Sequence, residues 1–211
     1  MGPLSDVAEY VPEDEPLLAA RASAADLGGT EPVLPAVGAA LRFLACAVGA
    51  RTAVEIGTGC GCSGIWLLRG MRPGSTLTSV DTEPEYQRVA RKAFTQAGFA
   101  QYQARLILGR ALDVLPRLSD GTYDLVFCDA DARDYPDYLT AALRLLRPGG
   151  VVAFNNALLA GPADPSGDDG DDEGKGDSSL DLASQVRSSD RLVPVLLPLG
   201  DGLLAAVKRG D

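Results

Sequence analysis

Residues 54–64 read VEIGTGCGCSG, an apolar segment that runs into a turn with glycine at alternate positions. Glycine permits positive φ angles and lets the backbone approach a ligand closely. A helix that begins after such a turn presents free N–H groups to an anionic group such as a carboxylate. Asp81 follows Gly61 by twenty residues and ends the next apolar segment, where a carboxylate can accept both hydroxyls of a ribose. The stretch therefore predicts a site for a nucleoside-containing ligand.

The glycine turn can be read in two registers. Gly59-x-Gly61-x-x-Gly64 matches the fingerprint of NAD-binding domains. The apolar segment ends at Ile56, however, so the turn begins at Gly57 and reads Glu-x-Gly-x-Gly-x-Gly. That register disfavours NAD, and a nicotinamide-dependent oxidoreductase is kept as an alternative.

Strand-like and helix-like segments alternate along the chain. The predicted strands are short, apolar and largely unalternating, as expected for strands buried on both faces. They are Thr52–Ile56, Thr76–Val80, Arg105–Leu108, Tyr123–Cys128 and Val151–Asn155. The predicted helices are Glu13–Asp26, Pro35–Val48, Ser63–Arg69, Pro84–Ala97, Ala111–Leu118 and Pro136–Leu146, the last ended by Pro148-Gly149-Gly150. This alternation predicts an α/β fold with a doubly wound parallel sheet.

The C-terminal part of the chain predicts a different end to the sheet. Two further strands, Leu192–Leu197 and Leu203–Val207, flank a short turn that contains proline and glycine. Strands joined by such a turn form an antiparallel hairpin. We therefore expect one domain over residues 1–211, with a mostly parallel seven-stranded sheet, a C-terminal antiparallel hairpin and helices on both faces. Residues 1–23 are expected to form an N-terminal extension.

Composition excludes several classes of protein. The 211 residues carry a net charge of −10, which argues against nucleic-acid binding because phosphates require a basic surface. No apolar run reaches the roughly 18 residues of a membrane span, and the acidic N-terminus does not resemble a secretory signal. The chain has no histidine, and its four cysteines form no CxxC pair, so a structural zinc site is not expected. These features predict a cytoplasmic protein with no membrane or nucleic-acid partner.

Much of the negative charge lies in one segment. Residues 162–179 hold seven acidic residues and one lysine, within a glycine-rich, low-complexity sequence. We expect a flexible acidic loop over residues 161–179. A solvated insertion is the favoured interpretation, and an acidic lid beside an acceptor pocket is the alternative.

The chain resembles the catechol and caffeoyl-CoA type of S-adenosylmethionine (SAM)-dependent O-methyltransferases, particularly small bacterial members of the actinobacterial kind. The matching segments appear in the family's order: VLPAVGAAL, VEIGTGCGCSGIWL, SVDTEPE, GRALDVLPRL, YDLVFCDADARDYPDYL and LRPGGVVAFNNALLAG. The resemblance implies a Rossmann-like class I methyltransferase fold, SAM as cofactor, a small-molecule acceptor and a homodimer.

The resemblance also implies a role for individual residues. Those expected to contact SAM are Val33, Glu55, Gly57, Thr58, Gly59, Gly61, Ser63, Asp81, Thr82, Arg110, Ala111, Asp129 and Asp131. Asp129 is expected to face both SAM and the acceptor and to be the polar catalyst. Asn155 and Asn156 are expected to contact the acceptor.

The chain departs from the family pattern at the catalytic end of the site. Members that bind magnesium carry an Asp-Asn pair where this chain has Asn155-Asn156, so a metal site would consist of Asp129 and two amides. Magnesium prefers charged oxygen ligands, and this set is poor. The family's lysine, read as the base near the acceptor hydroxyl, is replaced by Ala132. We expect metal-independent or weakly metal-assisted methylation of a phenolic hydroxyl, with a SAM-binding protein that has lost catalysis as the alternative.

Overall fold

The computed structural model describes residues 10–158 and 178–210. Seven strands form one sheet in the order β3-β2-β1-β4-β5-β7-β6. The strands are β1 (Thr52–Ile56), β2 (Thr76–Asp81), β3 (Ala104–Leu108), β4 (Tyr123–Cys128), β5 (Leu146–Phe154), β6 (Leu192–Leu197) and β7 (Leu203–Lys208). The first five strands are parallel, and β7 is antiparallel to both β5 and β6. The predicted fold, with its C-terminal hairpin, is confirmed.

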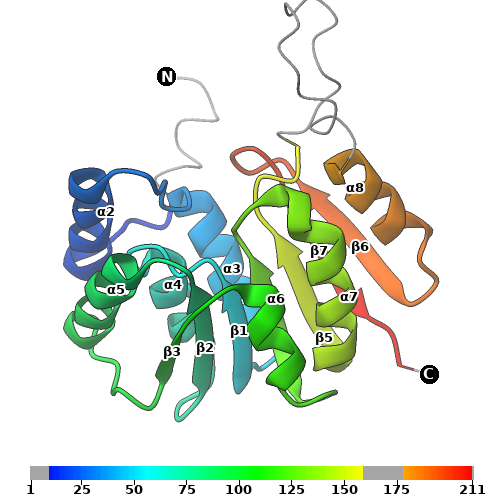
Figure 1. Ribbon diagram of the computed structural model, residues 1–211, viewed down its shortest axis with the longest axis horizontal. Coiled ribbons are helices and arrows are strands. Elements are labelled where there is room, and N and C mark those ends of the chain that lie inside the picture. The colour runs from blue at the N-terminus through cyan, green and yellow to red at the C-terminus, as the bar shows by residue number, and fades with distance from the viewer. Residues whose placement is uncertain (1–9, 159–177, 211) are drawn as a thin grey trace, which may run out of the picture.

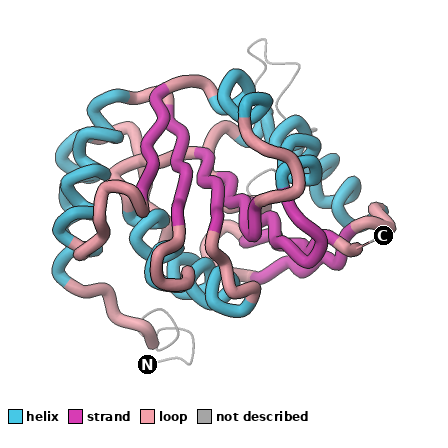
Figure 2. Tube along the Cα trace, turned by 90° about the horizontal axis from the view of Figure 1, so that it is seen from below, coloured by secondary structure: helices cyan, strands magenta, loops and turns pink. Residues whose placement is uncertain are grey.

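Helices cover both faces of the sheet (Figures 1 and 2). One apolar core holds side chains of α2 (Glu15–Leu27), α3 (Pro35–Ala47), α4 (Cys62–Gly70) and α5 (Pro84–Gln96). The other holds side chains of α6 (Ala111–Val114), α7 (Tyr135–Leu145) and α8 (Ser178–Ser188). Two short 3-10 helices complete the described elements: η1 (Leu115–Arg117) directly follows α6, and η2 (Ala132–Asp134) directly precedes α7. The central strands are therefore buried on both faces, which explains why their sequences are apolar without alternation.

The topology decides where a ligand can bind. β1 lies between β2 and β4, so the strand order reverses at its carboxyl end. In open α/β sheets ligands bind in the crevice at such a switch point. The turn after β1 and the residues that follow β2 and β4 meet at this edge of the sheet.

Two elements differ from the sequence-based prediction by more than two residues at one end. β5 begins at Leu146 instead of Val151 and runs through Pro148-Gly149-Gly150, because Leu146 pairs with Tyr123 before the register shifts. Gly149 permits this path with a φ of 76°. The helix predicted over Ala111–Leu118 ends at Val114 and continues as η1, since the ring of Pro116 cannot follow the α-helical path.

Helices at both ends of the described chain pack into the two cores. α2 is integral to the core, because Leu17, Ala20 and Ala24 are buried within it. α8 was not predicted, and it packs Leu182 and Val186 into the second core. Its first two residues overlap the loop expected over 161–179. The rest of that loop, with all seven of its acidic residues, lies outside the described residues, as do residues 1–9. Within the described ranges, no helix combines the length and apolarity needed to cross a membrane.

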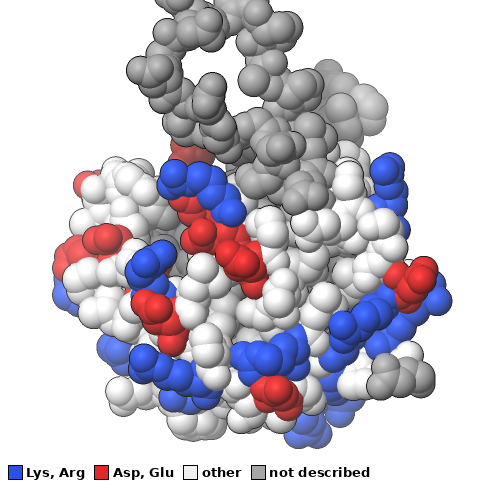
Figure 3. Space-filling view, turned by 45° about the vertical axis from the view of Figure 1, so that its right-hand side comes forward, with Lys and Arg blue, Asp and Glu red and all other residues white. Residues whose placement is uncertain are grey.

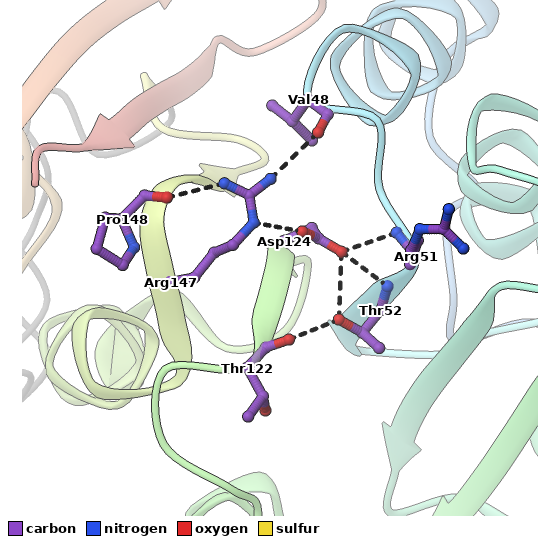
Figure 4. Close-up of polar contacts among 7 residues, drawn as sticks. All are labelled: Val48, Arg51, Thr52, Thr122, Asp124, Arg147 and Pro148. Carbon is purple, nitrogen blue, oxygen red and sulfur yellow. Dashed lines mark hydrogen bonds and ion pairs between the residues drawn. The ribbon is translucent and has the colours of Figure 1, made fainter.

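The edge of the sheet opposite the switch point is held by one carboxylate, Asp124 at the start of β4 (Figure 4). Its Oδ2 accepts hydrogen bonds from the backbone N–H groups of Arg51 (2.7 Å) and Thr52 (3.0 Å), and its Oδ1 accepts one from Arg147 Nε (2.6 Å). Arg147 Nη2 donates in turn to the Val48 carbonyl at 3.2 Å. Asp124 therefore links the starts of β1, β4 and β5 to the end of α3.

Replacing Asp124 by Ala is expected to lower the free energy of unfolding by about 2–4 kcal/mol, because two backbone donors and Arg147 lose their acceptor. Burial alone would raise the pKa of Asp124, but the amides of Arg51 and Thr52, with Arg147, hold it below its usual value. Its stabilising effect is therefore present above the carboxyl's ordinary pKa and is lost as the pH falls through the lowered one. Urea unfolding at neutral and acidic pH measures both effects.

Asp120 provides the matched control, because its carboxylate pairs with Arg144 but is 70% exposed. Asp120→Ala is expected to change stability by less than about 1 kcal/mol. Equal losses in the two variants would contradict the linking role of Asp124.

Candidate active site

Charge is distributed unevenly between the two edges of the sheet. Exposed arginines lie near the amino ends of the parallel strands and at the lower end of the C-terminal hairpin, and Figure 3 shows cationic side chains gathered along this lower edge. They include Arg51, Arg72, Arg105, Arg191 and Arg209. The opposite edge, at the switch point, carries exposed acidic residues such as Glu83 and Asp131 together with Arg110 and Arg133.

A pocket of about 380 Å³ opens at the switch point. Its lining comes from residues 29–33, the β1–α4 turn, and the residues after β2, β3, β4 and β5. Tyr86 from α5 and Tyr138 from α7 add two aromatic side chains. The pocket is thus assembled from segments distant in sequence that parallel topology brings to one edge.

Gly57 allows the ends of β1 and β4 to approach each other. Its φ is 94°, and a Cβ atom there would lie 2.1 Å from the backbone oxygen of Asp129. Its N–H donates to the Val80 carbonyl at 2.9 Å, while the Asp129 N–H donates to the Ile56 carbonyl at 2.8 Å. A side chain at position 57 would therefore push apart the two strand ends that form the pocket floor.

Hydrogen bonds from two backbone amides fix the orientation of the Asp81 carboxylate at the pocket. Its Oδ2 accepts from the Gly59 N–H and its Oδ1 from the Glu83 N–H, both at 2.9 Å. A carboxylate has about four lone-pair sites, so each oxygen can still accept a further hydrogen bond from a ligand. This geometry suits a pair of ribose hydroxyls.

Glu55 lies beneath the pocket and does not line it. The side chain is 0% exposed and accepts hydrogen bonds from Ser63 Oγ (2.7 Å) and Ser79 Oγ (2.5 Å). Burial raises its pKa to about 7, although the two hydroxyls oppose the shift. Thr58 Oγ1 lies 2.7 Å from Ser79 Oγ, which joins the glycine turn to the same network.

Asp129 follows β4 directly and lines the pocket. Its Oδ1 accepts a hydrogen bond from Asn155 Nδ2 at 2.9 Å. Burial raises the pKa of this carboxyl to about 6, with the Asn155 amide opposing the shift. The backbone of Asn155 is held by Tyr135, whose hydroxyl donates to the Asn155 backbone carbonyl oxygen at 2.9 Å. Asp129 is therefore a fixed carboxylate that can both hold and release a proton near neutral pH.

The residues predicted to contact SAM separate into two groups. Those that line the pocket are Val33, Gly57, Thr58, Gly59, Ser63, Asp81, Thr82, Ala111 and Asp129. Those outside its lining are Glu55, Gly61, Arg110 and Asp131. Of the two residues predicted to contact the acceptor alone, Asn156 lines the pocket with a φ of 54°, whereas Asn155 is buried behind Asp129. Contact of these residues with SAM or an acceptor stays a prediction.

Asp131 and Ala132 occupy the loop that follows Asp129. The Asp131 carboxylate is bound by Arg133 at 2.5 Å, and this contact lowers the pKa of Asp131. Ala132 begins η2 and packs against the second core. The position at which the family carries its lysine therefore presents no titratable group.

Sequence reasoning missed the two tyrosines of the pocket. Tyr86 lies in the first turn of α5, and its hydroxyl donates to the Gly28 carbonyl at 2.9 Å, which ties α5 to the N-terminal segment of the pocket. Tyr138 lies three residues after Tyr135 on the buried face of α7. Tyr86 follows Asp81 by five residues and Tyr138 follows Asp129 by nine, each in the helix after the strand end, and this placement was the available signal.

The donor set around Asp129 does not fit a magnesium ion. Asn155 turns its NH₂ group, and not its oxygen, toward the carboxylate. Among the residues that the structure describes, no group of three His, Cys, Asp or Glu side chains could hold a metal ion. One carboxylate with amides is a weak set for a cation that prefers charged oxygen ligands.

Comparison with known proteins places the chain in a family. A family model described as O-methyltransferase matches residues 17–209. "Probable O-methyltransferase Rv1220c" of Mycobacterium tuberculosis (strain ATCC 25618 / H37Rv) is 48% identical over 198 residues, covering 94% of this chain and 87% of the relative.

Two solved structures share the fold and hold ligands. The O-methyltransferase TomG of Streptomyces achromogenes, involved in tomaymycin synthesis and in complex with SAM, is 30% identical with a TM-score of 0.83, covering 98% of this chain and 95% of that one. An O-methyltransferase of Bacillus cereus in complex with S-adenosylhomocysteine (SAH) is 27% identical with a TM-score of 0.82, covering 98% and 96%. The resemblance seen in the motifs is confirmed, and the chain belongs to the O-methyltransferase family.

Proposed function

We propose that this protein transfers the methyl group of SAM to the hydroxyl of a small phenolic acceptor, without a metal ion. The observation that carries the proposal is the pocket itself. It combines a carboxylate suited to ribose hydroxyls, Asp81, with a second, largely buried carboxylate, Asp129, on either side of the glycine turn. The SAM complexes of related O-methyltransferases support this cofactor.

The acidic lining suits the charge of SAM. Among the described residues, the pocket is lined by four acidic residues and by no lysine or arginine; the acidic residues are Glu31, Asp81, Glu83 and Asp129. Partly buried carboxylates attract a cation such as a sulfonium more strongly than exposed ones do. The same charge disfavours acceptors that carry phosphate or carboxylate groups.

Asp129 is the proposed base. In the reaction the acceptor oxygen attacks the methyl carbon in line with the departing sulfur, the carbon–sulfur bond breaks, and SAH leaves. The phenolic proton passes to the Asp129 carboxylate. A base with a pKa of about 6 is matched better to an acidic phenol than to an aliphatic alcohol, whose proton is far harder to remove. Tyr138 offers an aromatic wall for the acceptor ring.

Methyl transfer from labelled SAM into a panel of catechols, simple phenols and aliphatic alcohols tests the proposal. We expect transfer to the more acidic phenols, and a change of less than about twofold between added magnesium and a chelator, because the donor set at Asp129 is weak. Asn155→Asp supplies the second carboxylate of the metal-binding family pattern and should make turnover respond to magnesium. Transfer that requires magnesium in the unmodified protein would contradict the metal-independent reaction.

A second candidate, a SAM-binding protein without catalysis, is favoured by one observation. Ala132 leaves the loop after Asp129 without the family's lysine. Tight binding of SAM together with no transfer to any member of the panel would support this candidate against the first.

A further inference from the structure

A second cavity, of about 190 Å³, lies beside α5 and the edge strand β3. These two elements lie together at one side of the molecule (Figure 1). The lining comes from the last turns of α5, the connection that follows and the first part of β3. Among the described residues, this α5–β3 cavity shares no lining residue with the pocket at the switch point, so the two are separate.

The lining of the α5–β3 cavity is apolar at its base and polar at its rim. The base consists of buried and half-buried side chains, those of Phe94, Phe99, Ala104 and Leu106. The exposed rim includes Arg91 and Gln101. Among the described residues no acidic side chain contributes to this lining, whereas four line the pocket at the switch point. The α5–β3 cavity therefore favours a ligand with an apolar body and an anionic group.

Arg91 is the group that can receive the anion. Within residues 10–158 and 178–210, no carboxylate forms an ion pair with Arg91. The preceding arginine of the same helix, Arg88, differs, because it pairs with Glu85 at 2.5 Å. A guanidinium presents its donors in a planar fork that matches both oxygens of a carboxylate. Arg91 can therefore bind the carboxylate of a molecule seated in the cavity.

The volume of the cavity limits the apolar body to about one ring. An apolar cavity of about 150 Å³ is large enough to hold a benzene molecule. Drug-sized ligands occupy pockets of about 300 Å³ or more. At about 190 Å³ the α5–β3 cavity lies between these sizes, and Phe94 and Phe99 offer aromatic side chains for a ring to pack against.

Phe94 connects this cavity with the glycine turn of the candidate active site. Its side chain is 2% exposed and contributes to the cavity lining. A Cβ atom at Gly64 would lie 2.7 Å from Phe94 Cε1, and one at Gly61 would lie 3.3 Å from the same atom. Ser63, between these two glycines, lines the pocket at the switch point. One side chain therefore borders the cavity and supports the turn.

We propose that the α5–β3 cavity binds a small carboxylate with a single aromatic ring, and that its occupation strengthens binding of the cofactor. The carboxylate pairs with Arg91 while the ring packs on the apolar base. A bound ring restricts Phe94, and with it the turn at Gly61 and Gly64, so less conformational entropy is lost when the cofactor binds. The binding site stands without the proposed function, whereas the coupling rests on it in one respect, the identity of SAM or SAH as ligand of the pocket.

Benzoate serves as the probe for the site, and NMR titration of the isotope-labelled protein without SAH measures its binding. We expect a Kd of about 1 mM, as is usual for so small a ligand, with shifts at Phe94, Phe99 and Leu106. Arg91→Gln should weaken benzoate binding about fivefold, as expected for a partly exposed ion pair. The same variant should leave the binding of benzamide, the neutral analogue, unchanged within about twofold.

Two variants on the same helix test the position of the probe. Lys92→Gln removes the neighbouring exposed cation, which is outside the lining, and should leave benzoate affinity within about twofold. Thr95→Phe places a ring in the cavity from an exposed lining position and should abolish the binding of benzoate and benzamide alike.

Calorimetric titration of SAH with and without saturating benzoate, at constant ionic strength, measures the coupling. SAH affinity should rise about fivefold with benzoate, near the lower end of the usual range for coupled sites. Reciprocity requires benzoate affinity to rise by the same factor with SAH bound. Phe94→Leu should keep benzoate bound through Arg91 and reduce the coupling to less than about twofold.

Several results would overturn the proposal. Benzoate that binds Arg91→Gln and Thr95→Phe as tightly as the unmodified protein, or that shifts only residues of the pocket at the switch point, would exclude the site. A smaller sedimenting mass for Thr95→Phe with no benzoate binding to either protein would show that a second copy covers this face instead. Unchanged SAH affinity at saturating benzoate would exclude the coupling. Failure of SAH to bind under any condition would overturn the proposed function, while the titration without SAH still decides the site.

Discussion

Asp129→Asn is expected to lower kcat by about 10²–10⁴-fold toward a phenolic acceptor, because the variant loses the group that takes up the phenolic proton. Asparagine has nearly the same shape and can still accept the hydrogen bond from Asn155 Nδ2. The loss should therefore fall on kcat, with the KM for SAM changed little. Steady-state kinetics with labelled SAM separates the two constants.

The pH dependence of the same variant identifies the reason for the loss. Burial raises the pKa of Asp129 to about 6, and the base must be ionised to act. The kcat of the unmodified protein should rise with pH up to about 6 and then level off, and Asp129→Asn should lack this rise. Asp137, exposed in the first turn of α7 and outside the pocket lining, supplies a control, since Asp137→Asn should leave kcat within about twofold. A large loss in kcat with an unchanged pH profile would show that Asp129 is not the base.

Gly57→Ala is expected to lower the free energy of unfolding by about 3–5 kcal/mol, among the largest effects of a single substitution. Two costs combine at this position. A φ of 94° strains any residue with a Cβ, and the Cβ would lie 2.1 Å from the Asp129 carbonyl oxygen. Because that oxygen belongs to the backbone, relief requires the ends of β1 and β4 to separate. Thermal and urea unfolding measure the loss, and SAH affinity should fall with it.

A substitution at Gly98 separates the cost of backbone strain from the cost of steric overlap. Its φ of 87° is close to that of Gly57, but a Cβ there has no atom within 4 Å. Gly98→Ala should cost only about 1–2 kcal/mol, the strain of the left-handed conformation alone. If the two variants lose the same stability, the close approach of β1 and β4 does not constrain position 57.

The sequence predicted most of the sheet because its signals are local. Thr52–Ile56, Tyr123–Cys128 and Leu192–Leu197 agree with the observed strands at both ends. Each is a short apolar run bounded by turn residues, and such a run is read without knowledge of its neighbours. The predicted start of β5 lies five residues after the observed one. Its first residue, Leu146, pairs with Tyr123 before the register between β4 and β5 shifts, and no local pattern reveals that pairing.

The candidate site was predictable to the extent that its residues follow strands. Gly57, Asp81 and Asp129 come directly after β1, at the end of β2 and after β4, and parallel topology sends these positions to one edge. Arg110 and Asp131 are also close to strand ends, yet neither lines the pocket. Sequence spacing places a residue at an edge of the sheet but does not decide the direction in which its side chain points. The Asp131 side chain points toward Arg133, with which it forms an ion pair.

The sequence by itself therefore determined the α/β class, the place of the switch point and the family, since periodicity, glycine turns and ordered motifs are properties of the chain read in order. Tertiary structure alone decided the surroundings of the two buried carboxyl groups, Glu55 and Asp129. It buried Glu55 against Ser79, twenty-four residues away, and turned Asn155 toward Asp129 instead of the pocket. Proton affinity and hydrogen-bond direction depend on which groups surround a carboxyl in space and how much water is excluded, and neither is written in local sequence.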